Sequence, residues 1–243
     1  MKQLTKTSPC RSVKMTLVIM CINLLGSIQL KSQLAPFNRP LDLSIHATNV
    51  MWLGANLVWE HNLTNHPRTW AIKGIDNWSQ QNLNNKTARI SDVVLVSSMV
   101  LSGLQTLTTI KDMRWNYVNL FSQNLMITLN TTQSIKLAFQ RTRPYTQSQQ
   151  YNSVESKTDD RLSFFSGHSS MTASAATTAM IIAFKYEDKN WMKYTALAGS
   201  ALTLTTAYLR VRAGKHYPSD VIAGLVVGTG ISLLNAYIHE NRH

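Results

Sequence analysis

The strongest structural signal in this sequence is one charged stretch. Residues 209–224 read LRVRAGKHYPSDVIAG and lie between two apolar segments that are each long enough to form a helix. Two arginines, a lysine, a histidine and an aspartate are costly to bury together unless they bind something. Pro218 predicts a helix start, because proline fits the first turn of a helix, where its missing N–H is not needed. The pattern therefore predicts a helix over 218–239 that begins beside the charged cluster.

Two residues of this stretch suggest chemistry. His216 lies just before the predicted helix, and Asp220 lies in its first turn. A carboxylate four residues after an imidazole can accept a hydrogen bond from one ring nitrogen and leave the other nitrogen free. The helix N-terminus adds unpaired N–H groups and a positive dipole, which favour an anion. These features predict a nucleophilic histidine beside an oxyanion pocket; a basic loop with a capped helix is the alternative.

A second cluster of basic residues ends an earlier segment. The sequence KLAFQRTRP holds Lys136 and Arg143, seven residues apart, and closes with Pro144. Seven residues make almost two helical turns, so the two cations are expected on nearly the same face of a helix. Proline disfavours a helical conformation at Arg143, which places that guanidinium at the helix end, where it can grip phosphate oxygens.

A third cluster carries a histidine. The sequence SFFSGHSS holds Ser166 as a candidate N-cap, so that Gly167 and His168 open a helix of small residues. An ordinary Ser-Gly cap with an incidental histidine is the alternative.

Helix signals predict four successive helices in the second half of the chain, over residues 115–140, 167–186, 191–210 and 218–239. Short connections make the last three antiparallel neighbours. His168 then opens one helix at the end where Arg210 closes the next and where His216 precedes the last. The three clusters are therefore expected to face one pocket.

The ordered motifs Lys-x6-Arg-Pro, Ser-Gly-His and Arg-x5-His-x3-Asp resemble those of the type 2 phosphatidic acid phosphatase (PAP2) family, which shares its fold with bacterial class A acid phosphatases and vanadium haloperoxidases. The resemblance covers about 91–239. It implies an all-α helical bundle with about six core helices and the active site at one end. Phe165 stands where the family commonly has proline, and Leu209 where it commonly has serine; neither change removes an ionisable group.

The resemblance also implies roles. His216 attacks phosphorus to form a phosphohistidine, Asp220 fixes its tautomer, and His168 protonates the leaving oxygen and then activates water. The phosphoryl oxygens are bound by Lys136, Arg143, Ser166, Gly167 and Arg210. Phosphoryl transfer mainly needs positioning and neutralisation of oxygen charge. Three fixed cations supply this, so no metal and no cofactor are expected.

The charge of the chain limits its partners. The formal net charge is +12, and residues 1–33 contribute five basic residues and no acidic one, which leaves +7 for the remainder. A basic protein favours nucleic acid, an anionic membrane surface or a phosphorylated substrate. We expect no nucleic-acid partner, because the chain has no zinc-finger spacing and no aromatic RNA-binding motif. A phosphorylated lipid or a small phosphate ester is the expected substrate, and nothing in the sequence indicates the oligomeric state.

The N-terminal segment 1–33 has the order of a signal peptide: a basic stretch, an apolar run over 15–25 and a polar end. An uncleaved anchor over 15–30 is the alternative. Both cysteines, Cys10 and Cys21, lie in this segment, so the rest of the chain offers no disulfide framework.

Two further regions follow the N-terminal segment. Residues 34–90 are expected to form an N-terminal helix, over 41–59, and a polar excursion. Residues 91–243 are expected from the resemblance to form the PAP2-like catalytic core, with Ser91 as the candidate N-cap of its first helix.

These observations predict an exported, metal-independent phosphatase of the cell envelope that acts on phosphate monoesters or pyrophosphates. A lipid phosphate is the expected substrate. We expect the protein to be membrane-associated, because segments 93–107 and 221–238 are apolar enough for membrane helices, and we expect its active site to face the periplasm. Three alternatives remain: a soluble periplasmic non-specific acid phosphatase, a vanadate-dependent haloperoxidase and a non-catalytic anion-binding envelope protein. Arg212, Lys215 and the loop 145–161 receive no role.

Overall fold

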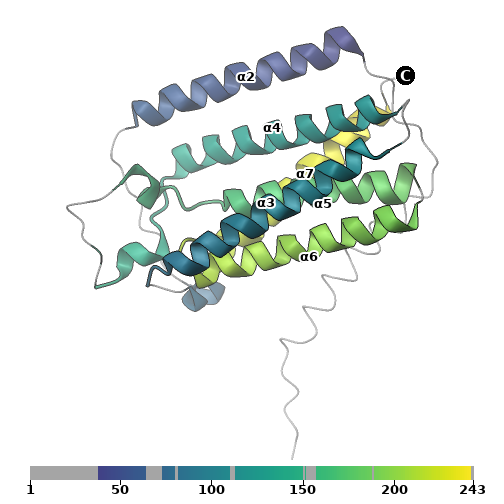
Figure 1. Cartoon of the computed structure of the whole chain (residues 1–243). Coiled ribbons are helices and arrows are strands. Elements are labelled where there is room, and N and C mark those ends of the chain that lie inside the picture. Colours follow the sequence, from purple (N-terminus) through teal and green to yellow (C-terminus); the bar gives the residue numbers. More distant parts are fainter. Residues whose placement is uncertain are drawn as a thin grey trace, which may run out of the picture. The chain divides into compact units, whose positions relative to one another are not determined.

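The computed structural model describes residues 38–63, 73–79, 82–109, 113–149, 151, 157–187 and 189–241. The signal peptide or anchor predicted over 1–33 lies outside these residues, as do parts of the polar excursion and of the loop 145–161. The described residues belong to one compact unit, Gln33–His243. This part of the chain has six α-helices and no β-strand, which confirms the predicted all-α class (Figure 1).

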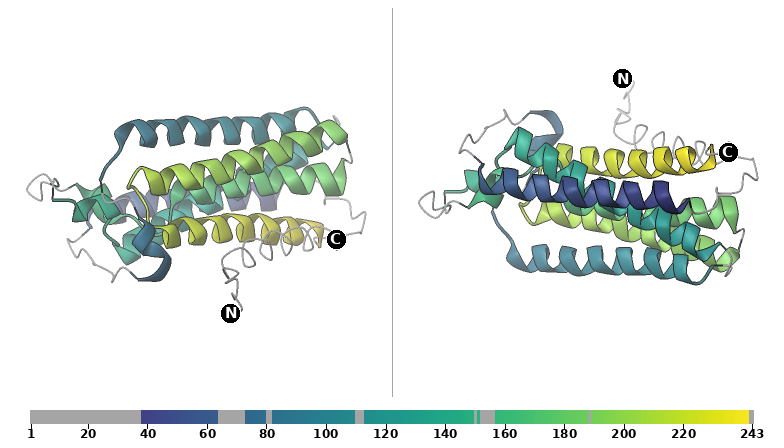
Figure 2. Two further views of the ribbon diagram at one scale, coloured as in Figure 1. Left: turned by 90° about the horizontal axis from the view of Figure 1, so that it is seen from below. Right: turned by 90° about the horizontal axis from the view of Figure 1, so that it is seen from above.

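The six helices alternate in direction along the chain (Figures 1 and 2). Their bounds are α2 (Arg39–His61), α3 (Asn85–Leu107), α4 (Arg114–Phe139), α5 (Gly167–Ile181), α6 (Asn190–Arg212) and α7 (Pro218–Glu240). The short helix α5 packs against α3, α4, α6 and α7, whereas α2 packs mainly on α4. The N-termini of α3, α5 and α7 and the C-termini of α2, α4 and α6 therefore gather at one end of the bundle.

Local signals explain most of the helix starts. Pro218 occupies the first turn of α7, and the Ser166 hydroxyl caps α5 by accepting from the Ser169 N–H, both as predicted. The N-cap predicted at Ser91 is wrong. The Asn84 side chain caps α3 by accepting from the Thr87 N–H, so this helix begins at Asn85. Ser91 consequently lies in the second turn of α3, buried in the bundle.

The end of α4 also differs from its prediction. This helix stops at Phe139, and Gln140 adopts a left-handed conformation with φ 44°. A left-handed residue commonly ends a helix and reverses the chain. Arg143 is extended, and its N–H donates to the Asp160 carbonyl oxygen at 2.8 Å. Lys136 and Arg143 therefore do not share a helical face: the reversal of the chain, rather than the helical spacing, brings Arg143 to the same end of the bundle.

Two glycines allow α7 to approach α5 closely. A Cβ atom at Gly224 would lie 2.6 Å from the Ser166 carbonyl oxygen, and one at Gly228 would lie 2.1 Å from the Ser170 carbonyl oxygen. Any larger residue would force the helices apart. The glycines thus hold the start of α7 against the start of α5, the two helix starts that carry the predicted catalytic residues.

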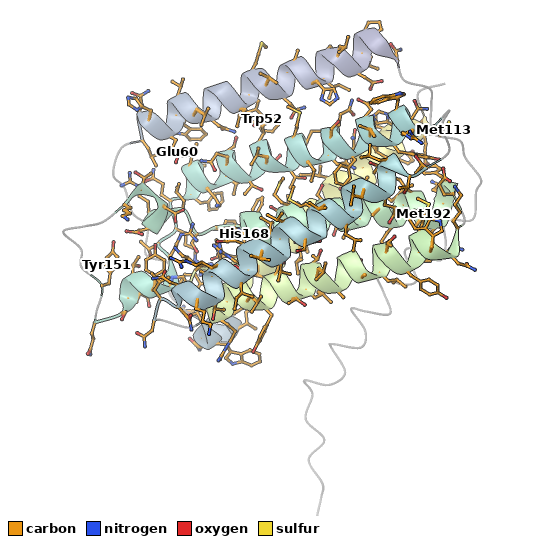
Figure 3. The ribbon with its side chains drawn as sticks, in the orientation of Figure 1. Trp52, Glu60, Met113, Tyr151, His168 and Met192 are labelled. Carbon is orange, nitrogen blue, oxygen red and sulfur yellow. The ribbon has the colours of Figure 1, made fainter. Side chains whose placement is uncertain are left out.

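The interior of the bundle is unusually polar. Amide side chains bridge the helices: Asn124 donates to Thr178, Asn235 donates to Asn124, and Asn130 donates to the Asn49 carbonyl oxygen. A small apolar core lies at the end opposite the predicted site residues and includes Tyr117, Leu120, Ile182 and Met192. Figure 3 shows Met113 and Met192 at that end, far from His168.

The exterior of the helices is apolar. Large exposed side chains cover α2, α3, α6 and α7, among them Val58, Val93, Leu204, Val226 and Leu234. By length and composition, α3 and α7 are able to cross a membrane. Polar side chains inside and apolar side chains outside reverse the arrangement of a typical water-soluble helical bundle.

Candidate active site

His216 lies in the turn between α6 and α7, with 1% of its surface exposed. Its Nδ1 atom is 2.9 Å from the Ser163 carbonyl oxygen. Because a carbonyl oxygen only accepts, Nδ1 carries the proton and Nε2 keeps its lone pair. Nε2 lies 3.2 Å from Nη1 of Arg143. The Asp220 carboxylate is 3.7 Å from Nδ1, so the carbonyl group makes the shorter contact with the ring.

The charge state of His216 suits a nucleophile. Burial, together with the nearby Arg143, Arg210 and Lys136 cations, holds the pKa of His216 well below its ordinary value. A histidine is neutral at any pH above its pKa. The ring therefore keeps its lone pair at neutral and mildly acidic pH.

Arg143 and Arg210 supply two cations near His216. Arg143 is buried, and it donates to the Lys215 carbonyl oxygen at 3.0 Å and to the Asp159 carboxylate at 2.5 Å. Arg210 is also buried, and its Nη1 atom contacts Ser91 Oγ at 3.1 Å. Within the described part of the chain, Nε of Arg210 is buried without a hydrogen-bond partner. Buried donors normally have partners, so an anion in the pocket would complete this set.

Lys136 supplies the third cation. Its Nζ atom lies beside Gly167, 3.6 Å from the position that a Cβ atom would take there. Among the described residues, this ammonium group has no hydrogen bond or ion pair, and Asp159 and Asp220 act on it only as nearby charges. Its three donors are therefore available to a ligand at the start of α5.

The start of α5 presents further donors. The Ser166 hydroxyl oxygen accepts from the N–H and the hydroxyl group of Ser169, so its own proton is left to donate. The N–H groups of the first helical turn, Gly167 and His168, have no partner within the helix. Together with Lys136, these groups are the kind of donors that bind a phosphate or another anion at a helix N-terminus.

His168 forms the other side of the pocket. Its Nε2 atom is 2.7 Å from Oδ1 of Asp92, and the same oxygen is 3.3 Å from Nη1 of Arg210. A cavity of about 380 Å³ opens at this point, lined by Asn85, Ala88, Arg89, Asp92, His168, Arg210 and Lys215. The bulk of a bound substrate therefore has room beside His168.

The two basic residues without a predicted role lie in different places. Lys215 is half-buried, lines the cavity beside His168, and places its Nζ atom 5.0 Å from the centre of the Tyr145 ring. Burial and the neighbouring Arg143 cation lower the pKa of Lys215. Arg212 is exposed and lines a separate cavity with residues 82–85.

The structure gathers all the predicted site residues at one end of the bundle: Lys136, Arg143, Ser166, Gly167, His168, Arg210, His216 and Asp220. Figure 3 shows His168 at this end, on the same side as Glu60 and Tyr151. Residues that support the site were missed: Asp92 contacts His168 and Arg210, Asp159 contacts Arg143, Ser163 contacts His216 and Asp220, Arg141 contacts Asp220, and Asp76 contacts Arg141. Of these, only Arg141 had a sequence signal for a role in the site, because it lies two residues before Arg143 in a basic run.

The fold and the site define an all-α bundle with a cationic, histidine-containing pocket at one end. A model of the PAP2 superfamily matches residues 118–243, which is more than half of the chain. The chain therefore belongs to the PAP2 superfamily, whose members are generally phosphatases. No curated protein and no solved structure matches it. The matched region contains all three motifs, whereas Asp76 and Asp92 lie before it.

Proposed function

We propose that this protein is a phosphatase that hydrolyses phosphate monoesters or pyrophosphates through a phosphohistidine intermediate, with a lipid phosphate of the cell envelope as its substrate. One observation carries the proposal: Nε2 of His216, the ring nitrogen that carries the lone pair, lies 3.2 Å from Nη1 of Arg143, and the pKa of this ring is lowered by Arg143, Arg210 and Lys136 together. Cations near such a nitrogen position a phosphoryl group and neutralise its oxygens, which is most of what phosphoryl transfer requires.

In the first step, Nε2 of His216 attacks phosphorus while the bond from phosphorus to the leaving oxygen breaks. His168 gives its proton to that oxygen, and the leaving group departs as an alcohol from a monoester or as a phosphate from a pyrophosphate, while the phosphoryl group stays on His216. The phosphorylated ring carries a positive charge because Nδ1 keeps its proton on the Ser163 carbonyl oxygen. Lys136, Arg143 and Arg210 hold the three phosphoryl oxygens during transfer.

In the second step, His168 takes a proton from water, and the resulting hydroxide attacks phosphorus. The bond from phosphorus to Nε2 breaks, inorganic phosphate leaves, and His216 returns to its neutral form. The cavity beside His168 supports this order of events, because the departing group and the entering water both reach the pocket from that side.

We place the bundle in the inner membrane, with the site at its periplasmic surface. The polar interior and apolar exterior support this placement, and so do the exposed aromatic side chains at both ends. Trp59, Trp78 and Tyr208 lie toward the active-site end, and Trp115, Trp191, Tyr194 and Tyr237 lie toward the other. Tryptophan and tyrosine are enriched at the two interfaces of a membrane.

The activity is tested on the purified full chain with a panel of phosphorylated lipids, soluble phosphate monoesters and pyrophosphates. We expect phosphate release that vanadate inhibits, because vanadate resembles the phosphoryl group in transfer. EDTA is expected to have little effect, since the three cations supply the charge that a metal would otherwise supply. Absence of hydrolysis across the panel, or strong inhibition by the chelator, would contradict the proposal.

The membrane placement is tested by extraction with alkaline carbonate, which releases peripheral and soluble proteins from membranes. We expect the chain to stay in the membrane fraction, because large apolar side chains cover α3 and α7. Full release, together with hydrolysis of soluble esters and not of lipids, would favour the soluble periplasmic acid phosphatase instead.

A further inference from the structure

A carboxylate outside the PAP2-matched region, that of Asp76, is joined to Asp220 through Arg141. Asp76 lies in the 3-10 helix η1 (Gly74–Trp78) and is buried. Its Oδ1 atom accepts from the Ser219 N–H at 2.9 Å, and its Oδ2 atom accepts from Ser219 Oγ at 2.7 Å. Oδ2 also accepts from Nη2 of Arg141 at 2.8 Å. The polar excursion before α3 is thus attached to the first turn of α7.

Arg141 joins this carboxylate to a second one. Its Nη1 atom donates to Oδ1 of Asp220 at 2.5 Å, and its guanidinium carbon lies 4.0 Å from the centre of the Tyr217 ring. The side chain of Arg141 is 3% exposed. A buried arginine that bridges two carboxylates is held rigidly, because its planar donors match both partners.

Asp220 connects Arg141 to His216. It is fully buried, and its Oδ2 atom accepts from Ser163 Oγ at 2.6 Å and from the Tyr217 N–H at 3.0 Å. The same oxygen lies 3.7 Å from Nδ1 of His216. Contacts therefore run from Asp76 through Arg141 and Asp220 to the back of the imidazole, on the side away from Nε2.

The charges of Asp76, Arg141 and Asp220 do not cancel. Two carboxylates and one guanidinium sum to −1 when both acids are ionised. Burial alone would raise the pKa of Asp76, but hydrogen bonds from Arg141 and Ser219 bring it below its ordinary value. Without Asp76, the Arg141 cation would offset Asp220 alone, and the charge behind the ring would fall to about zero.

We propose that Asp76 is a positioning residue, which acts through Arg141 and Asp220 to keep a net negative charge behind His216. This inference rests on the proposed function. The imidazole is neutral before it attacks and positive once it carries the phosphoryl group. A fixed negative charge behind the ring therefore stabilises the phosphorylated imidazole more than the free imidazole. This difference lowers the barrier to phosphorylation.

The test compares Asp76→Asn with Asp76→Glu in the full chain. Asparagine keeps the shape but loses the charge, whereas glutamate keeps the charge on a longer side chain. We expect Asp76→Asn to lower kcat by about 10-fold or more with KM changed less than about threefold, since Asp76 touches no substrate. Asp76→Glu is expected to stay within about fivefold of the wild type. Single-turnover formation of the phosphoenzyme should slow in the same proportion.

The control is Glu60→Gln, which removes a carboxylate at the same end of the bundle, on α2, where it accepts from Gln133. We expect wild-type turnover from this variant. Equal losses from Asp76→Asn and Asp76→Glu would show a packing role and overturn the inference, as would unchanged turnover in Asp76→Asn. A wild-type chain that hydrolyses nothing would instead remove the proposed function itself, so the two failures are distinguishable.

Discussion

Replacing His216 with alanine is expected to reduce phosphate release by about 10³-fold or more, because the variant has no atom that can accept the phosphoryl group. The loss should appear in kcat, and the acid-labile phosphoenzyme trapped by rapid quenching of the wild type should be absent. Vanadate binding should weaken but persist, since Lys136, Arg143 and Arg210 remain in place.

The matched control for this change is His61→Ala, at an exposed position near the end of α2. We expect it to keep wild-type turnover, and circular dichroism should show both variants folded. Turnover in folded His216→Ala equal to that of the wild type would exclude the phosphohistidine mechanism.

The lowered pKa of His216 sets an expectation for the pH profile of the wild type. A histidine loses its lone pair only as the pH falls through its pKa, and burial among cations places this pKa well below the ordinary value. We therefore expect the nucleophile to stay active through mildly acidic pH, with the acidic limb of kcat/KM below the range of an ordinary histidine.

Replacing His168 with alanine is expected to slow phosphoenzyme formation strongly. The factor by which it slows should depend on the leaving group of the substrate. An alkoxide is a poor leaving group and needs a proton, whereas p-nitrophenolate leaves without one. We expect phosphoenzyme formation to slow by about 10²- to 10⁴-fold with an alkyl phosphate and by much less with p-nitrophenyl phosphate.

Single-turnover measurements are needed here, because His168 also activates water in the second step and steady-state rates mix the two steps. Equal slowing of phosphoenzyme formation for both substrates would contradict a role in protonating the leaving group. Such a result would instead fit a residue that only shapes the pocket beside Asp92 and Arg210.

Several helix boundaries illustrate what local sequence can and cannot predict. The starts of α5 and α7 follow from Ser166 and Pro218, because capping and proline geometry are local effects. The start of α3 was misplaced because two residues, Asn84 and Ser91, are both capable caps. The bundle uses Asn84 and buries Ser91 against Arg210 instead.

Tertiary contacts also revise the support of His216. The sequence spacing assigns the imidazole tautomer to Asp220, four residues on. In the structure, the Ser163 carbonyl oxygen makes the shorter contact with Nδ1, and the carboxylate bonds mainly to Arg141, Ser163 and Tyr217. A backbone carbonyl group has no residue-type signature, so no motif could have indicated it.

Local sequence signals were enough to predict the all-α class of this protein, its resemblance to the PAP2 family and the ordered set of cations and histidines. These follow from local capping and from residue types at short spacings, both of which are readable along one segment. The groups that support these cations and histidines became visible only in the folded chain. Asp76, Asp92 and Arg141 gain their positions from elements far apart in the chain, because buried charges take partners wherever the packing of helices brings them.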